Sequence, residues 1–244
     1  SPLYFCAASE TARDVAQDYC ETKLGSLPTH KFTHYVLGNP AYEELPEMDP
    51  TGRAFRYLLE VYVDDFVSLV IPTSREQLRH VSTGTMMGIH DVFPADDTDS
   101  NDPISENKLK KLEGEYAPTK TILGFAFDGV AKTLWLEDAK RAHLLTVLHS
   151  WLRSGRTGTS GIPFKEFESI VAKLRHAFTA IPAGRGLLTL CNKILQMKPP
   201  VVYLHRNAVL QAAIAGCRTL LCESLDAPTH CCELVSGWPD YIGV

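Results

Sequence analysis

The pattern of apolar residues is clearest between Phe55 and Ile71. Most positions in this run are aromatic, β-branched or leucine, and the acidic pair Asp64-Asp65 interrupts it near its centre. Runs of this composition are typical of strands. Because two adjacent aspartates suit a turn better than a strand interior, the pattern predicts a β-hairpin with both carboxylates at its turn.

Helical spacing flanks this hairpin on both sides. Apolar residues recur every three or four positions in 9–24, where Ser9 is a plausible N-cap and a glycine follows the last turn. Residues 74–90 also predict a helix. The proline-containing stretch 26–53 predicts a long connection, and the acidic stretch 91–107 predicts an exposed, mobile loop.

The second half of the chain changes from strands to helices. Two short strand patterns, Thr121–Phe127 and Thr133–Leu136, are separated by Asp128-Gly129, a tight-turn signal that predicts a second hairpin. The segment 154–161 is rich in Gly, Ser and Thr, which indicates a flexible joint. Apolar stripes at helical spacing predict helices over 138–153, 164–180, 184–196 and 206–225. The expected fold class is α+β.

Composition narrows the functional classes only a little. Hydrophobic residues make up 45% and charged residues 22% of the chain, as in ordinary globular proteins. The net charge of −5 gives no general basic character, so nucleic-acid binding would need a local basic surface. Residues 139–218 are rich in Lys, Arg and His, whereas the acids crowd one stretch: Asp91, Asp96, Asp97, Asp99, Asp102 and Glu106.

The cysteines favour a reducing, intracellular compartment, cytoplasmic or nuclear. They form no Cys-x-x-Cys pair and lie mostly in apolar surroundings, as buried thiols do: Cys6, Cys20, Cys191, Cys217, Cys222, Cys231 and Cys232. A zinc site at His230, Cys231 and Cys232 is disfavoured, because adjacent cysteines suit tetrahedral ligation poorly. The sequence has no membrane span or signal pattern. Its opening on Ser1-Pro2 suggests a piece of a longer polypeptide.

The paired aspartates carry the strongest chemical signal. Two like charges this close raise each other's pKa unless a cation lies between them, and hard oxygen ligands suit Mg²⁺ or Mn²⁺. An ordinary solvent-facing turn is the alternative for an Asp-Asp pair alone. However, apolar residues at 61–63 and 66–70 would hold these two acids rigidly. With a second metal about 4 Å away, such a site can catalyse nucleotidyl transfer.

At this point the chain resembles reverse transcriptases of retroelements. Tyr62-Val63-Asp64-Asp65 is similar to their Tyr-x-Asp-Asp motif, and Pro2 and Phe5 resemble their Pro-x-x-Phe segment. Leu123-Gly124-Phe125 resembles the hairpin called the primer grip. Phe164–Leu188 is similar to the thumb helices of retrotransposon enzymes, especially those that carry a tyrosine recombinase. The resemblance covers most of residues 1–195.

The resemblance implies an RNA-directed DNA polymerase that copies an RNA or DNA template with a primer and deoxynucleoside triphosphates. Residues 1–136 would form the later part of the palm, 137–200 the helical thumb, and 201–244 a helical connection toward a ribonuclease-H-like domain. In related enzymes that domain can follow the thumb, and 238–244 reads as the start of a strand. By resemblance, the template and nucleotide would contact Pro2, Phe5 and Tyr62, and the nucleic-acid backbone would contact Lys173, Arg175, His176 and Arg185.

The chain also departs from this family. Its polymerases use a third carboxylate on an earlier strand, and Asp14 and Asp18 follow the Pro-x-x-Phe segment, so neither can replace it. The isolated fragment is therefore expected to be inactive without the rest of its polyprotein. By resemblance, Lys120 would assist pyrophosphate departure, with Lys110 and Lys111 as rivals. Two alternatives stay open: a domesticated remnant that binds nucleic acid or protein without catalysis, and an unrelated α+β protein.

Overall fold

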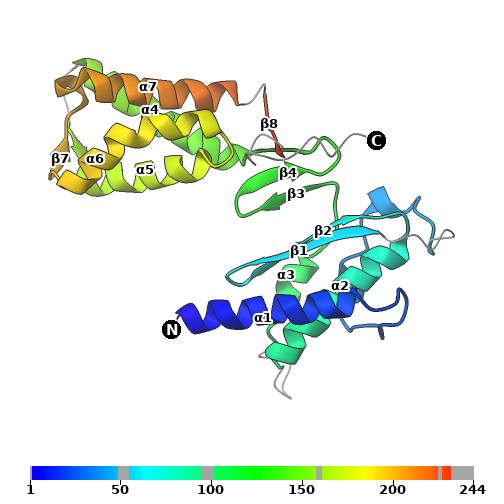
Figure 1. The fold of residues 1–244 in the computed structure, drawn as a ribbon. Helices are drawn as coiled ribbons and strands as arrows, with labels where there is room; N and C mark the ends of the chain where they lie inside the picture. The colour runs from blue at the N-terminus through cyan, green and yellow to red at the C-terminus, as the bar shows by residue number, and fades with distance from the viewer. Residues whose placement is uncertain (1, 49–54, 95–101, 158–160, 225–226, 232–244) are drawn as a thin grey trace. The chain divides into compact units, whose positions relative to one another are not determined.

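The computed structural model describes residues 2–48, 55–94, 102–157, 161–224 and 227–231. It divides into two compact units, Ser1–Ala117 and Pro118–Val244, each described here by itself (Figure 1). Helices and small antiparallel sheets alternate in both, which confirms the expected α+β class. The joint expected within 154–161 lies partly, and the strand expected at 238–244 wholly, outside the described residues.

Two long helices form the base of the first unit: α1 (Pro2–Cys20) and α2 (Arg75–Val92). They pack so closely that a Cβ added to Gly88 would lie 2.5 Å from the backbone nitrogen of Ala16. Helix α1 begins seven residues before the expected start at 9, and Ser9 is not an N-cap. Its hydroxyl lies inside the helix and donates to the carbonyl of Phe5 at 3.1 Å, while Pro2 supplies the fixed φ that suits a first turn.

The predicted hairpin is present beside these helices. Strand β1 (Arg56–Tyr62) pairs with β2 (Asp65–Ile71) in an antiparallel register that sets Tyr62 opposite Asp65. Two contacts tie the hairpin to α1: Arg13 pairs with Glu60 at 3.2 Å, and Gln17 donates to the Tyr57 hydroxyl at 3.0 Å. Figure 1 shows the two strands lying along the helices.

The connection after α1 is more ordered than its prolines suggested. It contains the short 3-10 helices η1 (Thr33–Tyr35) and η2 (Pro40–Tyr42). Further along, α3 (Glu106–Lys110) begins at the end of the acidic stretch. These segments meet α2 around a small apolar cluster formed by Phe32, Val36, Met86 and Leu109.

The acidic stretch was expected to be wholly exposed, and at Asp102 that expectation is wrong. The Asp102 side chain is only 9% exposed, forms an ion pair with Lys31 at 2.6 Å and makes a hydrogen bond with His90 at 2.9 Å. The backbone amide of Ile104 also donates to it at 2.8 Å. His90 in turn lies 3.0 Å from the Nε2 atom of His30. Through this network, Asp102 joins the connection after α1, at Lys31 and His30, to the end of α2 at His90.

The second unit begins with a sheet whose turns differ from the prediction. Among the described residues, the strand order is β3 (Thr119–Ile122), β4 (Phe125–Asp128), β5 (Thr133–Leu136) and β8 (Thr229–His230), all antiparallel. The single strand expected over 121–127 is split by a two-residue turn at Leu123-Gly124, where φ is 50° and 83°. Asp128 instead opens a longer loop, because its carboxylate accepts the amides of Val130 and Ala131.

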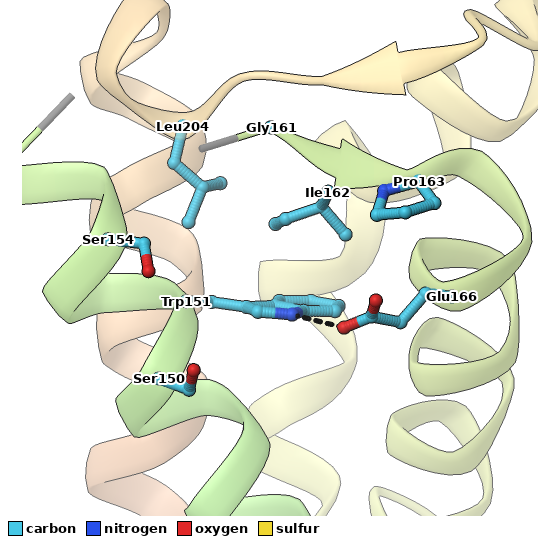
Figure 2. A pocket seen from close by; sticks show the side chains of 8 residues that line it. All are labelled: Ser150, Trp151, Ser154, Gly161, Ile162, Pro163, Glu166 and Leu204. Carbon is cyan, nitrogen blue, oxygen red and sulfur yellow. Dashed lines mark hydrogen bonds between the residues drawn. The ribbon is translucent and has the colours of Figure 1, made fainter. Parts of the chain in front are cut away.

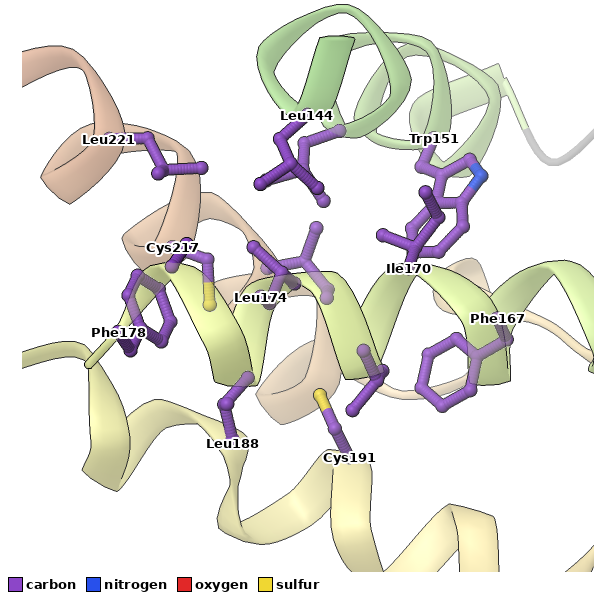
Figure 3. Close-up of a cluster of buried hydrophobic side chains, with 14 of the residues drawn as sticks. Leu144, Trp151, Phe167, Ile170, Leu174, Phe178, Leu188, Cys191, Cys217 and Leu221 are labelled. Atoms are coloured by element: carbon purple, nitrogen blue, oxygen red, sulfur yellow. The ribbon is translucent and has the colours of Figure 1, made fainter. Parts of the chain in front are cut away.

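Four helices build the rest of the second unit: α4 (Asp138–Thr157), α5 (Phe164–Ala177), α6 (Thr189–Met197) and α7 (Ala208–Glu223). Each turns apolar side chains into one common core (Figure 3). Leu144 comes from α4, Leu174 from α5, Cys191 from α6, and Ile214 and Cys217 from α7. Because α7 is part of this core, it belongs with the preceding helices, although a separate connection was expected from residue 201.

The helix expected over 184–196 forms only in its later part. Residues Pro182–Leu188 are the 3-10 helix η4, in which Gly184 is buried against the ring of Phe178. A Cβ on that glycine would lie 2.4 Å from the ring, so the tight turn requires a glycine there. At the other end of the helices, β6 (Ile162–Pro163) pairs with β7 (Val201–Val202), and η5 (Leu204–Arg206) leads into α7.

Candidate functional site

The tip of the β1–β2 hairpin places both aspartates in solvent. Val63 and Asp64 form its two-residue turn, and Asp65 begins β2. Asp64 and Asp65 are exposed, and among the described residues neither carboxylate pairs with a cation of the protein. Val63 has a φ of 61°, which a β-branched residue rarely adopts. Such a conformation costs about 1–3 kcal/mol and is found where the surrounding structure imposes it, often at functional sites.

The strands behind the tip hold these carboxylates in place. Val61 and Phe66 are half-buried on the side that packs toward the helices, whereas Tyr62 is 62% exposed beside the aspartates. Leu58, opposite Leu69, leaves an apolar surface on the outer face. The arrangement offers two adjacent hard oxygen donors on a rigid support, and divalent cations such as Mg²⁺ or Mn²⁺ prefer such donors.

The site needs further ligands to bind two metals. Among the described residues, no group of three or more His, Cys, Asp or Glu side chains is arranged to hold an ion. Pro2 starts α1, and the ring of Phe5, 45% exposed, contacts Phe93 at 5.9 Å between ring centroids. Phe5 therefore makes its ring contact at the end of α2.

The candidate lysines belong to different units. Lys120 lies half-buried on β3, opposite Phe127. Lys110 and Lys111 lie in the first unit at the end of α3, where Lys110 pairs with Glu106 at 3.1 Å. The structure of each unit by itself does not distinguish Lys120 from Lys110 and Lys111 as the lysine that would assist pyrophosphate departure.

The predicted primer-grip residues form the tip of the β3–β4 hairpin. Leu123 is 41% exposed there, and Gly124 has a positive φ of 83°. Phe125 stacks on the imidazole of His176, with 4.5 Å between ring centroids and 29° between planes. His176 also makes a hydrogen bond with the backbone of Leu123. The structure therefore joins the hairpin tip to α5 through one of the residues predicted to contact nucleic acid.

Helix α5 turns its apolar stripe inward, as predicted. Phe167, Ile170, Val171, Leu174 and Phe178 are buried, while Lys173, Arg175 and His176 are exposed.

The predicted backbone contacts, however, do not share one face. Lys173 and Arg175 lie about 200° apart around the helix, and each contacts a different neighbour. Lys173 Nζ lies 3.2 Å from His143 Nε2 on α4, whereas Arg175 donates to Asn192 on α6 at 2.8 Å. Arg185 donates to the carbonyl of Phe178 at 3.2 Å, so it has a structural role in the turn.

Sequence reasoning missed two basic residues beside Lys173 and His176. Lys140 and His143, both exposed, lie one turn apart on α4. Lys140 reaches the hairpin tip, since its Nζ occupies the space that a Cβ on Gly124 would take. We call Lys140, His143, Lys173 and His176 the basic cluster. The sequence did contain one sign of this cluster, since basic residues recur at i and i+3 in both 140–143 and 173–176. Only the packing of α4 on α5 shows that these two pairs of residues lie together.

Electrostatics keep His176 largely neutral. Burial lowers the pKa of this imidazole, the positive charge of Lys140 lowers it further, and the hydrogen bond with the Leu123 backbone opposes both effects. A hydrogen bond between Lys173 and His143 also requires a neutral ring, because an ammonium group only donates. The basic cluster thus combines two lysines with two imidazoles, one of which accepts from Lys173 while the other has a lowered pKa.

A small pocket lies at the opposite end of the helices from this cluster, between α4, β6 and η5 (Figure 2). Trp151 crosses it, and its indole Nε1 donates to Glu166 at 2.9 Å. Ser150 and Ser154 line one side. The tryptophan–glutamate bond closes the space between α4 and α5, which indicates a structural role.

Comparison with known proteins leaves the function to be argued from this geometry. No protein-family model, curated protein or solved structure matches the chain. In the part of the chain that the structure describes, no helix has both the length and the apolar character needed to cross a bilayer.

Proposed function

We propose that this chain is the later palm and the thumb of a reverse-transcriptase-like, RNA-directed DNA polymerase. One observation carries the proposal: Asp64 and Asp65 stand exposed at the two-residue turn of the β1–β2 hairpin, with Val63 beside them at a strained φ of 61°. An ordinary surface turn would place Asn or Gly at such a φ. A valine at this φ is consistent with a site whose shape matters more than its local stability.

Asp64 and Asp65 would hold Mg²⁺ or Mn²⁺, and their hard, exposed oxygens fit this role. When bound, the ions would supply the charge that offsets a triphosphate during nucleotidyl transfer. The two carboxylates orient this centre, Tyr62 would contact the nucleotide or template from its exposed position on β1, and Pro2 and Phe5 would support the same ligands. Lys120 is the proposed donor to the departing pyrophosphate. A third carboxylate would come from the rest of the same polyprotein.

The second unit would hold the primer and template. The tip of the β3–β4 hairpin and the basic cluster form one continuous surface, because His176 contacts Leu123 and Phe125 while Lys140 lies against Gly124. Lysine side chains on such a surface bind phosphates by charge and without sequence preference. Arg175 and Arg185, which make contacts within the protein, contribute less than Lys173 and His176.

Metal binding tests the first part of the proposal in this chain itself. Mn²⁺ broadens the NMR signals of nearby residues, so the amides of 61–67 should broaden first. Asp64→Asn and Asp65→Asn should each weaken that effect severalfold. Asp18→Asn is the matched control, since Asp18 is another exposed aspartate of the first unit. Equal broadening in all three variants would contradict the metal site.

Catalysis is tested in the longer polypeptide. Either Asp64→Asn or Asp65→Asn should abolish Mg²⁺-dependent primer extension, and Asp18→Asn should not. The 244-residue chain alone should not extend a primer, because two carboxylates hold two metals poorly. Wild-type synthesis by either asparagine variant would refute the assignment.

A second candidate function is a non-catalytic nucleic-acid-binding remnant. It is favoured by two observations: the basic cluster lies within the second unit, and among the described residues no group of three or more His, Cys, Asp or Glu side chains is arranged to hold an ion. Primer–template binding by the longer polypeptide without any extension would support this alternative.

A further inference from the structure

The basic cluster brings lysine and histidine side chains close enough together for each to affect the charge of its neighbours. Lys140 and His143 come from α4, and Lys173 and His176 come from α5. The hairpin tip adds the Phe125 ring and the Leu123 backbone around His176. The nearby acid is Glu137, whose carboxylate lies 3.6 Å from Lys140 Nζ. All four basic side chains are exposed, so a ligand can reach them.

The hydrogen bonds fix which groups are charged before a ligand arrives. Lys173 donates to His143, so this imidazole is an acceptor and therefore neutral. His176 is partly buried and lies near the cation of Lys140, and both circumstances disfavour a positive charge on its ring. In the free protein, Lys140 therefore opposes protonation of His176, while the ring of His143 is occupied as an acceptor from Lys173.

We propose that the basic cluster takes up protons when it binds a nucleic-acid backbone, so that its grip on a duplex strengthens as the pH falls through the physiological range. Phosphate oxygens would draw the Lys173 ammonium away from His143, which frees the ring nitrogen to accept a proton. The same negative charge offsets Lys140 and allows His176 to become positive. The inference rests on the proposed role of the second unit in binding primer and template, and adds how that binding is regulated.

Binding through lysine contacts alone would not strengthen as the pH falls. Lys140 and Lys173 stay charged at any pH near neutral, so they contribute salt dependence without pH dependence. Proton uptake by two histidines adds both a pH dependence and a further salt dependence, because each imidazolium that forms on a phosphate also releases a counterion. The two contributions can therefore be separated in one set of titrations.

The test uses the 244-residue chain and a fluorescently labelled RNA–DNA hybrid duplex at constant ionic strength. We expect the dissociation constant to be about tenfold lower at about pH 6 than at about pH 8. The double variant His143→Gln/His176→Gln should bind more weakly than the wild type even at about pH 8, and its affinity should gain less than about twofold on acidification. His149→Gln is the matched control, because His149 is an exposed histidine on another face of α4.

Calorimetry gives a second readout that a structural role would not change. Binding heats measured in two buffers with different ionisation enthalpies report the number of protons taken up, which should fall toward zero in the double variant. Tight binding without pH dependence, or the same pH dependence in the double variant, would overturn this inference and leave the proposed function intact. No binding to the duplex at any pH would overturn both.

Discussion

Replacing Asp102 by asparagine should destabilise the first unit. Asp102 is the centre of the buried network, where it accepts from Lys31, His90 and the amide of Ile104. Asparagine has almost the same shape but carries no charge, and its amide group would direct N–H donors toward one of these donors. The variant thus removes the electrostatic part of the network and leaves its packing nearly unchanged.

The size of the effect follows from how exposed each partner is. The Lys31 side chain is 47% exposed and can return to water, so that ion pair contributes less than about 1 kcal/mol. His90 is only 19% exposed, and its charge-assisted bond with Asp102 contributes about 1.5–3 kcal/mol. We therefore expect Asp102→Asn to lower the free energy of unfolding of this unit by about 2 kcal/mol.

The network also makes stability depend on pH in two windows. Burial, His90 and Lys31 lower the pKa of His30 from 6.5 to about 4. As the pH falls, His30 binds a proton in the unfolded chain before it does so in the folded protein. The stability that depends on neutral His30 is therefore complete above pH 6.5 and is lost as the pH falls toward 4. Solvent screening reduces this loss to about 1–2 kcal/mol.

The lower window belongs to Asp102. Burial alone would raise its pKa, but bonds from Lys31, His90 and Ile104 outweigh it and lower the pKa from 3.8 to about 2. Stability present above 3.8 is therefore lost as the pH falls through 2. This window should disappear in Asp102→Asn, whereas the His30 window should remain, because burial is its largest cause and the Asp102 charge opposes it.

Hydrogen exchange measured by mass spectrometry suits this test, because it reads the peptides of α2 separately from those of the second unit. Exchange of α2 should be about thirtyfold faster in Asp102→Asn than in wild type near neutral pH, which corresponds to about 2 kcal/mol. Asp18→Asn should exchange like the wild type. If Asp102→Asn protects α2 as well as the wild type does, or if protection does not fall between about pH 6.5 and 4, the network does not stabilise the unit as argued.

Other predictions concern single contacts. Val63→Asn should relieve the positive φ and raise the urea midpoint by an amount equivalent to about 1 kcal/mol, and an unchanged or lower midpoint would show that Val63 is not strained. Gly88→Val should separate α1 from α2 and lower stability by more than about 3 kcal/mol in the same titration, whereas a small loss would mean that the helices can move apart freely. Trp151→Phe should lose the bond to Glu166 and cost about 1 kcal/mol, measured as faster exchange in α4 and α5 but not in α2.

Sequence patterns predicted correctly those helices and strands that are determined by residues close together in the chain. The β1–β2 hairpin and α2 appear where the sequence placed them, because strand composition and an acidic turn, or helical spacing, are properties of neighbouring residues. The strand pattern missed the β3–β4 turn because Leu123-Gly124 is a weak turn signal beside Asp128-Gly129, whereas the resemblance to a primer-grip hairpin did place a hairpin at these residues. There the leucine adopts a φ that its own preference disfavours, and the four-stranded sheet around it imposes that conformation.

Features that depend on distant residues could not be predicted in this way. Asp102 lies in an acidic stretch and is typical of a solvent-exposed loop until Lys31 and His90 come into contact with it. Similarly, Lys173 and Arg175 are close in sequence, yet they contact different helices. The candidate carboxylates were found because they are adjacent in sequence, whereas the basic cluster required the packing of two helices.

The place of α7 in the helical core has a consequence for synthesis of the chain on the ribosome. Helices α4, α5 and α6 leave the exit tunnel first, and their apolar sides have no cover until Ala208–Glu223 follows. From Asp138 to Glu223 the ribosome adds 85 residues (223 − 138), which takes about 4–17 s. During this interval the nascent chain exposes leucines and phenylalanines that chaperones bind, so a stop near residue 200 should yield an aggregating product rather than a smaller folded one.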